Sequence, residues 1–262
     1  IAPYLTTQWH QDSPFNDRFP VADEGYVYST NGKFVAGCTT IALAQVLNYH
    51  AYPSNIVLNG RSHSWDNIGQ FTFNVYIADD YLLDCMSRFI YDLAIELDVE
   101  CQSNGTTAGF GDVQRVMIQQ GYRNISYGTP SQSTIRTMLV NSKPVLFSGF
   151  MVDDPTTDEN EYSGHSWVMD GWKTIETITT RVTYNAWGVE KSREVVNRYE
   201  TDYVHCNMGY DGDANGYYTF NIFNLSSIKP EGKYEPNYGD NQNTVNATYT
   251  TNFEMLIYDT WN

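Results

Sequence analysis

One cysteine stands directly before a strongly apolar helical run near the start of the chain. Cys38 follows Gly37, and residues 41–47 read Ile-Ala-Leu-Ala-Gln-Val-Leu, which is too apolar for a surface helix. The backbone N–H groups at a helix N-terminus create a positive field that lowers a thiol pKa and favours the nucleophilic thiolate. Cys38 is therefore a candidate nucleophile. The alternative is that it serves only as a small buried apolar side chain.

A thiol nucleophile needs a base, and the chain offers five histidines. His165 opens a predicted strand in the second half of the chain, where it can face the N-terminus of the Cys38 helix. His50 ends that same helix and would lie about 18 Å from Cys38, at a rise of 1.5 Å per residue. His10 and His63 are expected to be surface residues in loops. His165 is therefore the predicted base.

Composition and charge exclude several classes of function. The chain has 262 residues, 15% of them aromatic, and a net charge of −16, so it is predicted to be an ordered globular protein. Because nucleic acids and anionic membranes require clustered positive charge, neither is an expected partner. No apolar stretch approaches the roughly 18 residues that cross a bilayer. The four cysteines contain no Cys-x-x-Cys pair, which argues against a zinc site.

Helical patterns dominate the first half of the chain and strand patterns the second. After an extended segment at 1–35, apolar periodicity predicts helices at 38–50, 79–97, 112–120 and 131–141. Runs rich in Thr, Val and Tyr predict strands at 144–150, 166–172, 177–187, 203–208, 216–222 and 253–258. We expect one α+β domain spanning residues 1–262. A mainly helical subdomain (about 1–142) would pack against an antiparallel β-sheet subdomain (143–262), with an active-site cleft between them.

Seven motifs resemble the streptopain family of bacterial papain-like cysteine peptidases, and they occur in the family's order over roughly residues 5–225. They are Trp9–Asn16, Ala36–His50, Ser64–Asn67, Lys143–Gly149, Ser163–Gly171, His205–Asn207 and Asn215–Tyr218. The resemblance implies a papain-like fold and hydrolysis of peptide bonds through a thioester acyl-enzyme, with no cofactor and no metal.

The resemblance also implies a role for each of four residues. Cys38 would be the nucleophile, and His165 would act first as general base and then as general acid. Gln11 matches the glutamine whose side-chain amide helps to form the oxyanion hole, together with the backbone N–H of Cys38. Asn207 matches the asparagine of the family's Asn-Trp-Gly-Trp-Gly-Gly segment, which orients or shields the histidine.

That segment departs from the family pattern, because Met208 and Tyr210 stand where the family has tryptophan. A degenerate, non-catalytic protein-binding member of the family is therefore an alternative function. A third possible function is that of an acyl transferase with the same papain-like fold. The run from Asn185 to Gly188 resembles the matching segment of plant-type papain enzymes. The Asn-Gly-Tyr-Tyr sequence that follows Asn207 favours Asn207 instead and assigns 185–188 to an inserted hairpin.

Partners and location follow from the same resemblance. Family precursors carry a leader and an inhibitory propeptide upstream, and neither is present here, so we expect the mature domain of a secreted or cell-envelope-associated endopeptidase. Its expected partners are protein or peptide substrates and the propeptide of the precursor. Asp211–Gly216 also matches the first half of a calcium loop, but Ile222 stands at the twelfth position, where such a loop carries glutamate.

Overall fold

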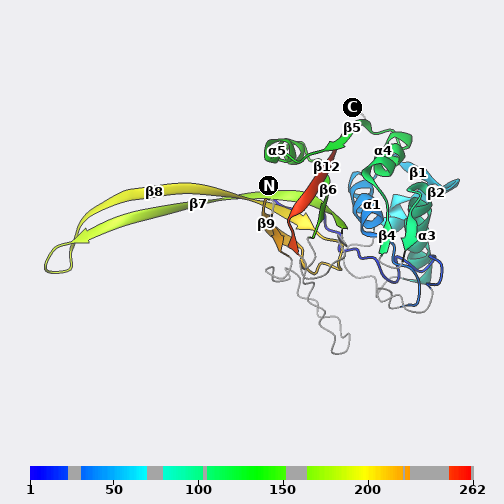
Figure 1. Ribbon diagram of the computed structural model, residues 1–262, viewed down its shortest axis with the longest axis horizontal. Coiled ribbons are helices and arrows are strands. Elements are labelled where there is room, and N and C mark those ends of the chain that lie inside the picture. The colour runs from blue at the N-terminus through cyan, green and yellow to red at the C-terminus, as the bar shows by residue number, and fades with distance from the viewer. Residues whose placement is uncertain are drawn as a thin grey trace, which may run out of the picture.

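The computed structural model describes residues 1–22, 31–69, 79–102, 105–151, 164–220, 222–224 and 248–260. In these residues an antiparallel sheet lies beside a group of helices, and a long hairpin extends away from the sheet (Figure 1). The helices are α1 (Cys38–His50), α2 (Trp65–Ile68), α3 (Asp80–Glu96), α4 (Phe110–Gln119) and α5 (Gln132–Val140). The predicted α+β class is confirmed.

The main sheet has six strands in the order β5-β12-β6-β7-β8-β9, and every neighbouring pair is antiparallel. Its strands are β5 (Arg123–Gly128), β6 (Val145–Phe150), β7 (Gly164–Tyr184), β8 (Glu190–Asn207), β9 (Gly216–Thr219) and β12 (Thr251–Asp259). Three two-stranded ribbons accompany it: β1 (Asn55–Leu58) with β2 (Arg61–Ser64), β3 (Glu100–Gln102) with β4 (Gly105–Thr107), and β10 (Phe223–Asn224) with β11 (Thr248–Tyr249).

Helix α1 is the centre of the packing. All residues from 39 to 47 are buried, as expected for a helix that is apolar on every side. α1 packs against β7 of the sheet on one side and against α3 on another. Its N-terminus lies close to the first residues of β7, because the Thr39 and Ser166 hydroxyls are 3.0 Å apart. The side chains at 165–172 in β7 are buried without interruption, and this part of the chain contacts α1, α5 and the N-terminal residues, which bond to Asp170 and Trp172.

Most of the predicted elements are confirmed, but α2 and the strands of the three small ribbons were not predicted, and β8 begins at Glu190 rather than at 203. α4 begins at Phe110, two residues before the predicted start. The strands predicted at 166–172 and 177–187 form the single strand β7, because the exposed residues 173–176 continue the strand after its buried pattern ends. β5 was not predicted, yet it pairs with β12 at the edge of the sheet. The subdomain boundary near residue 142 stays a prediction.

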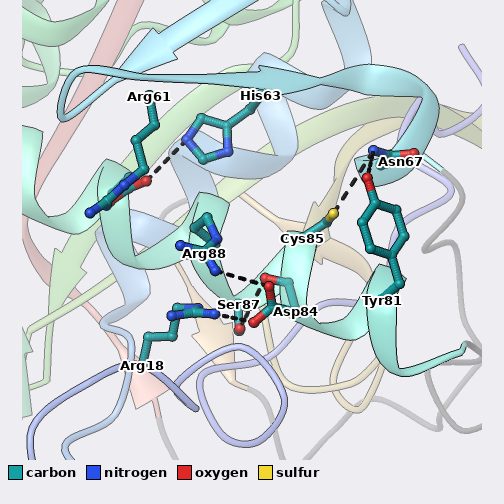
Figure 2. A network of polar contacts seen from close by, with 10 residues as sticks. Arg18, Arg61, His63, Asn67, Tyr81, Asp84, Cys85, Ser87 and Arg88 are labelled. Atoms are coloured by element: carbon teal, nitrogen blue, oxygen red, sulfur yellow. Dashed lines mark hydrogen bonds and ion pairs between the residues drawn. The ribbon is translucent and has the colours of Figure 1, made fainter.

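A polar network fastens the ribbon β1–β2 and helix α2 to α3 (Figure 2). His63, expected on the surface, is buried in β2 with its Nε2 3.2 Å from the Asp92 carboxylate of α3. Asp92 is fully buried and also accepts a hydrogen bond from Arg61 at 2.5 Å. The expectation of a surface position for His63 is therefore wrong, because the ring is enclosed between β2 and α3, edge-on to Phe89, and burial there lowers its pKa. His10 lies in a loop as predicted, but it is partly buried with its ring edge-on to Phe15.

Strands β7 and β8 continue beyond the body as a curved two-stranded arm (Figure 1). The turn at its tip comprises 185–189, where the Trp187 side chain is 86% exposed, so the hairpin expected around 185–188 is confirmed. Cross-strand ion pairs join Arg181 to Glu194 and Arg198 to Glu176. The helices do not cover the arm (Figure 1). Separately, no helix in the described part of the chain is long and apolar enough to cross a bilayer.

We predict that the arm can be shortened without loss of the fold. Thr174 and Asp202 are paired at its base, where the Thr174 hydroxyl donates to the Asp202 carboxylate at 2.6 Å. Replacing residues 175–201 by Asn-Gly, which favours a two-residue turn, should change the melting temperature by less than about 4 °C. The matched control is Trp172→Ala in the buried base of the arm, which should lower it by more than about 6 °C. A shortened chain that fails to fold would contradict the prediction.

Candidate active site

The thiol of Cys38 lies on the first residue of α1. Gly37 precedes it with φ of 90°, and a Cβ there would come within 2.8 Å of the Thr106 carbonyl oxygen, so only glycine fits. No side chain caps the helix at Gly37, which leaves the first-turn N–H groups directed at the thiol and its surroundings. The sequence Gly-Cys therefore places the sulfur in the positive field that was predicted for it.

The structure brings Cys38 and His165 together from opposite sides, α1 and the start of β7. Burial raises the pKa of the thiol, but the hydrogen bond and charge of His165, with the Ser166 N–H and the Thr39 hydroxyl, outweigh it and lower the pKa to about 7. The Thr39 hydroxyl also lies 3.0 Å from the Ser166 hydroxyl, which ties α1 to β7 beside the sulfur. The arrangement favours a thiolate near neutral pH.

A backbone carbonyl contacts the His165 imidazole on the side away from Cys38. His165 Nε2 lies 2.8 Å from the carbonyl oxygen of Met208, in the segment that follows β8. Since a carbonyl can only accept, Nε2 carries a proton, and in the neutral ring Nδ1 is then left as the acceptor on the side of Cys38. This is the tautomer that a base for the Cys38 thiol requires.

Asn207 supports that carbonyl and does not touch the histidine. Its Nδ2 donates to the Thr7 carbonyl at 2.7 Å, and its Oδ1 accepts from Gln45 Nε2 and the Gly209 N–H, both at 3.2 Å. Within the described residues, no hydrogen bond joins Asn207 to His165. The role assigned to Asn207 stays a prediction. The group that contacts the ring is the carbonyl of the next residue, Met208, and a side-chain pattern gives no signal of a backbone contact.

Three aromatic rings lie nearly parallel to the imidazole, and sequence reasoning missed two of them. The ring of Tyr210 lies 4.8 Å from that of His165 at an angle of 10°, and Tyr249 in β11 lies 5.5 Å away at 21°. Trp167, two residues along β7, is 6.0 Å away at 21°. The motif comparison singled out Tyr210 as a departure, while the sequence gave no signal for Tyr249 or for the stacking of Trp167.

Gln11 lies in the loop beside the residues that lead into α1. Its backbone carbonyl accepts from the Ala36 N–H at 2.8 Å, which brings Gln11 next to the segment ending at Cys38. The side chain is partly buried. An oxyanion role for its amide stays a prediction that agrees with this neighbourhood.

The other histidines and cysteines are engaged elsewhere. His205 Nδ1 pairs with the buried carboxylate of Asp170 at 2.6 Å, and His50 Nε2 lies 2.8 Å from the Tyr258 hydroxyl. Burial raises the pKa of Cys206 well above its ordinary value and raises that of Cys101 as well. Neither sulfur has the acidity of Cys38.

The Asp211–Gly216 loop carries two carboxyl groups of raised pKa. Burial and the neighbouring Asp213 raise the pKa of Asp211 to about 6, and burial raises the pKa of Asp213. Asn215 directs its Oδ1 at the Met208 N–H, 2.8 Å away, so this loop helps to fix the carbonyl that holds His165. In the described part of the chain, no group of three or more His, Cys, Asp or Glu side chains is arranged to hold a metal ion.

Comparisons with known proteins find one matching family and solved structures of similar fold. The sequence model of the Peptidase C10 family matches residues 9–218. The structure of active wild-type interpain A cysteine protease from Prevotella intermedia is similar at 19% sequence identity and a TM-score of 0.62, covering 98% of this chain and 93% of that one. A prointerpain A fragment from the same organism is similar at 19% identity and a TM-score of 0.60, covering 98% and 71%. No curated protein sequence matches the chain.

The lowered pKa of Cys38 predicts selective alkylation. A thiol is protonated below its pKa, so the rate of reaction with iodoacetamide should rise through a midpoint near pH 7 and fall as the pH drops below it. Cys101 and Cys206, whose pKa values are raised, should stay unmodified at pH 7. Peptide mass spectrometry after timed alkylation distinguishes the sites.

The matched variant is His165→Ala, which removes the hydrogen bond and charge that offset burial. Its Cys38 midpoint should move above the ordinary value of 9.0. An unchanged midpoint in this variant would mean that His165 does not act on the thiol.

Proposed function

This chain belongs to the Peptidase C10 family, the streptopain family of cysteine peptidases, and we propose that it cleaves peptide bonds within proteins through a Cys38–His165 thiolate–imidazolium pair. One observation carries the proposal. A thiol of lowered pKa at a helix N-terminus meets a histidine whose far nitrogen is fixed by a carbonyl acceptor. A nucleophile, its base and a group that orients the base are the parts that covalent acyl transfer needs.

The reaction begins with attack of the Cys38 thiolate on the scissile carbonyl carbon. Negative charge develops on the carbonyl oxygen, where the Cys38 N–H and the Gln11 side-chain amide would donate hydrogen bonds. The imidazolium of His165 then gives its Nδ1 proton to the leaving amine as the C–N bond breaks, which leaves a thioester on Cys38.

Deacylation uses the same groups in reverse. Neutral His165 takes a proton from water, the resulting hydroxide attacks the thioester carbon, and the C–S bond breaks to release the carboxylic acid and restore the thiolate. Throughout the cycle the Met208 carbonyl keeps its hydrogen bond to Nε2, so the ring presents Nδ1 to each partner in turn. Asn207 acts indirectly, by holding the backbone on either side of Met208.

The expected substrates are proteins or peptides. The expected site of action is outside the cell or at its envelope, following release from a propeptide. A solved relative described as prointerpain A supports the idea of a precursor in this fold group. The strongly acidic chain, with a net charge of −16, disfavours strongly acidic substrates.

The non-catalytic alternative rested on Met208 and Tyr210 in place of tryptophans. Two observations weigh against it. Met208 contributes through its backbone carbonyl, which is the same for any residue, and Tyr210 keeps an aromatic ring over the imidazole. The substituted positions therefore retain contacts that an active site would use.

Turnover of a casein-type substrate under reducing conditions tests the proposed function. Cys38→Ala should lower activity by at least about 10³-fold, and an epoxide inhibitor of cysteine peptidases should abolish the activity of the unmodified protein. A folded protein without activity under these conditions would favour the binding-only alternative. Cleavage that survives Cys38→Ala would rule out this nucleophile.

A separate variant isolates the oxyanion contribution. Gln11→Ala should lower kcat by about 10²-fold to 10³-fold, while the midpoint of Cys38 alkylation stays near pH 7. Gln120→Ala is the control, because that amide donates to the Val57 carbonyl at the exposed end of α4. Equal activity of the two glutamine variants would remove Gln11 from the mechanism.

A further inference from the structure

Tyr210 contacts the imidazole of His165 in an unusual way. The two rings are stacked within 10° of parallel, and the Tyr210 hydroxyl oxygen lies 3.3 Å from Nδ1. Because a phenol oxygen lies in the plane of its own ring, it reaches Nδ1 from the face of the imidazole rather than along the in-plane lone pair. That lone pair therefore stays directed at Cys38, and the phenol adds a second contact to the same nitrogen.

The backbone and a second tyrosine hold Tyr210 in this position. Gly209, at φ of 73°, precedes it and donates its N–H to Asn207, and a Cβ on Gly209 would already touch Ile41 of α1 at 3.4 Å. Tyr249 also acts on the Tyr210 hydroxyl, and its own ring lies over the same imidazole. Burial raises the pKa of Tyr210 well above its ordinary value, so the group stays a neutral phenol while the cysteine and histidine exchange their proton.

The charges around the His165 imidazole determine how much the Tyr210 contact can stabilise it. Among the described residues, the ionisable groups that face His165 are Cys38 from α1, Tyr210 from the loop after β8 and Tyr249 from β11. In the described part of the chain, no ion pair or hydrogen bond joins the imidazole to a carboxylate. A cation over the face of a phenol ring is attracted by its electron density, and the phenol oxygen adds partial negative charge at Nδ1.

We propose that Tyr210 is a positioning residue for this reaction. Its ring holds the imidazole of His165 by one face, and its oxygen stabilises the imidazolium in the thiolate–imidazolium pair. The inference rests on the proposed function, because it assigns Tyr210 a role in forming that pair. A tryptophan at this position would supply a similar ring, but its only polar group is an N–H donor, which cannot stabilise a neighbouring cation. Tyrosine therefore does more here than cover the histidine.

The test compares Tyr210→Phe and Tyr210→Trp with the unmodified protein, using the pH dependence of Cys38 alkylation by iodoacetamide. Tyr210→Trp loses the oxygen but supplies the ring that attracts a cation most strongly, so its midpoint should rise by less than that of Tyr210→Phe. Tyr210→Phe keeps a ring and loses the oxygen, so the ion pair should weaken and the midpoint should rise by about half a pH unit. At pH 6 the alkylation rate should fall about threefold, and the acid limb of kcat/KM for peptide hydrolysis should move in the same direction and by the same amount.

The control removes a comparable hydroxyl elsewhere. The Tyr4 hydroxyl donates to the Leu139 carbonyl at 2.7 Å and does not contact His165, so Tyr4→Phe should leave the midpoint unchanged. A uniform loss of reactivity in Tyr210→Phe without a shift of the midpoint would reveal a purely structural role and overturn the proposal. A midpoint like that of the unmodified protein, at full reactivity, would overturn it as well.

The same measurement separates this inference from the proposed function. An alkylation midpoint near 9 in the unmodified protein would contradict the ion pair itself. A midpoint near 7 that Tyr210→Phe does not shift would leave the ion pair in place and contradict only the role of Tyr210.

Discussion

The hydrogen bond from His165 Nε2 to the Met208 carbonyl is the interaction on which the rest of the site depends. It fixes the tautomer and orientation of the imidazole, and it joins the start of β7 to the residue that directly follows β8. The register of β7 and β8 pairs Val168 with Asn207, so His165 and Met208 are brought together by the sheet itself. A one-residue slip in this pairing would send the histidine to the opposite face of the sheet. The pairing of β7 with β8 therefore both builds the sheet and sets the position of the imidazole.

Burial and polarity act against each other around the sulfur. An apolar helix under the sheet gives a rigid platform, but burial alone would raise the pKa of the Cys38 thiol and make it inert. The groups that reverse this effect all lie at the seam between α1 and β7, namely His165, the Ser166 N–H and the Thr39 hydroxyl. The packed core thus extends as far as the Cys38 sulfur, and a few hydrogen-bond donors beside the sulfur lower its pKa.

Sequence patterns predicted the helices and strands in which apolar residues repeat at a regular spacing. The apolar run after Cys38 predicted α1, which the structure confirms, while the site roles that the family motifs assign to Gln11, His165 and Asn207 stay predictions. The patterns missed two kinds of interaction. One kind uses backbone groups, which every residue has, and the other joins side chains or strands that are far apart in the sequence. The Met208 carbonyl belongs to the first kind, and Tyr249 and the β5–β12 pairing belong to the second. His63 was misjudged because a buried carboxylate on a later helix, Asp92, decides its position.

The arm formed by β7 and β8 has a consequence for how such proteins diverge. An antiparallel hairpin returns the chain to the place where it left the sheet, whatever its length, so insertions and deletions at the tip leave the pairing of Val168 with Asn207 untouched. The spacing of 42 positions from His165 to Asn207 is therefore not a fixed property of the site. Sequence signatures that rely on the spacing between these two positions will fail to recognise homologues with arms of other lengths, whereas signatures built on each strand separately will find them.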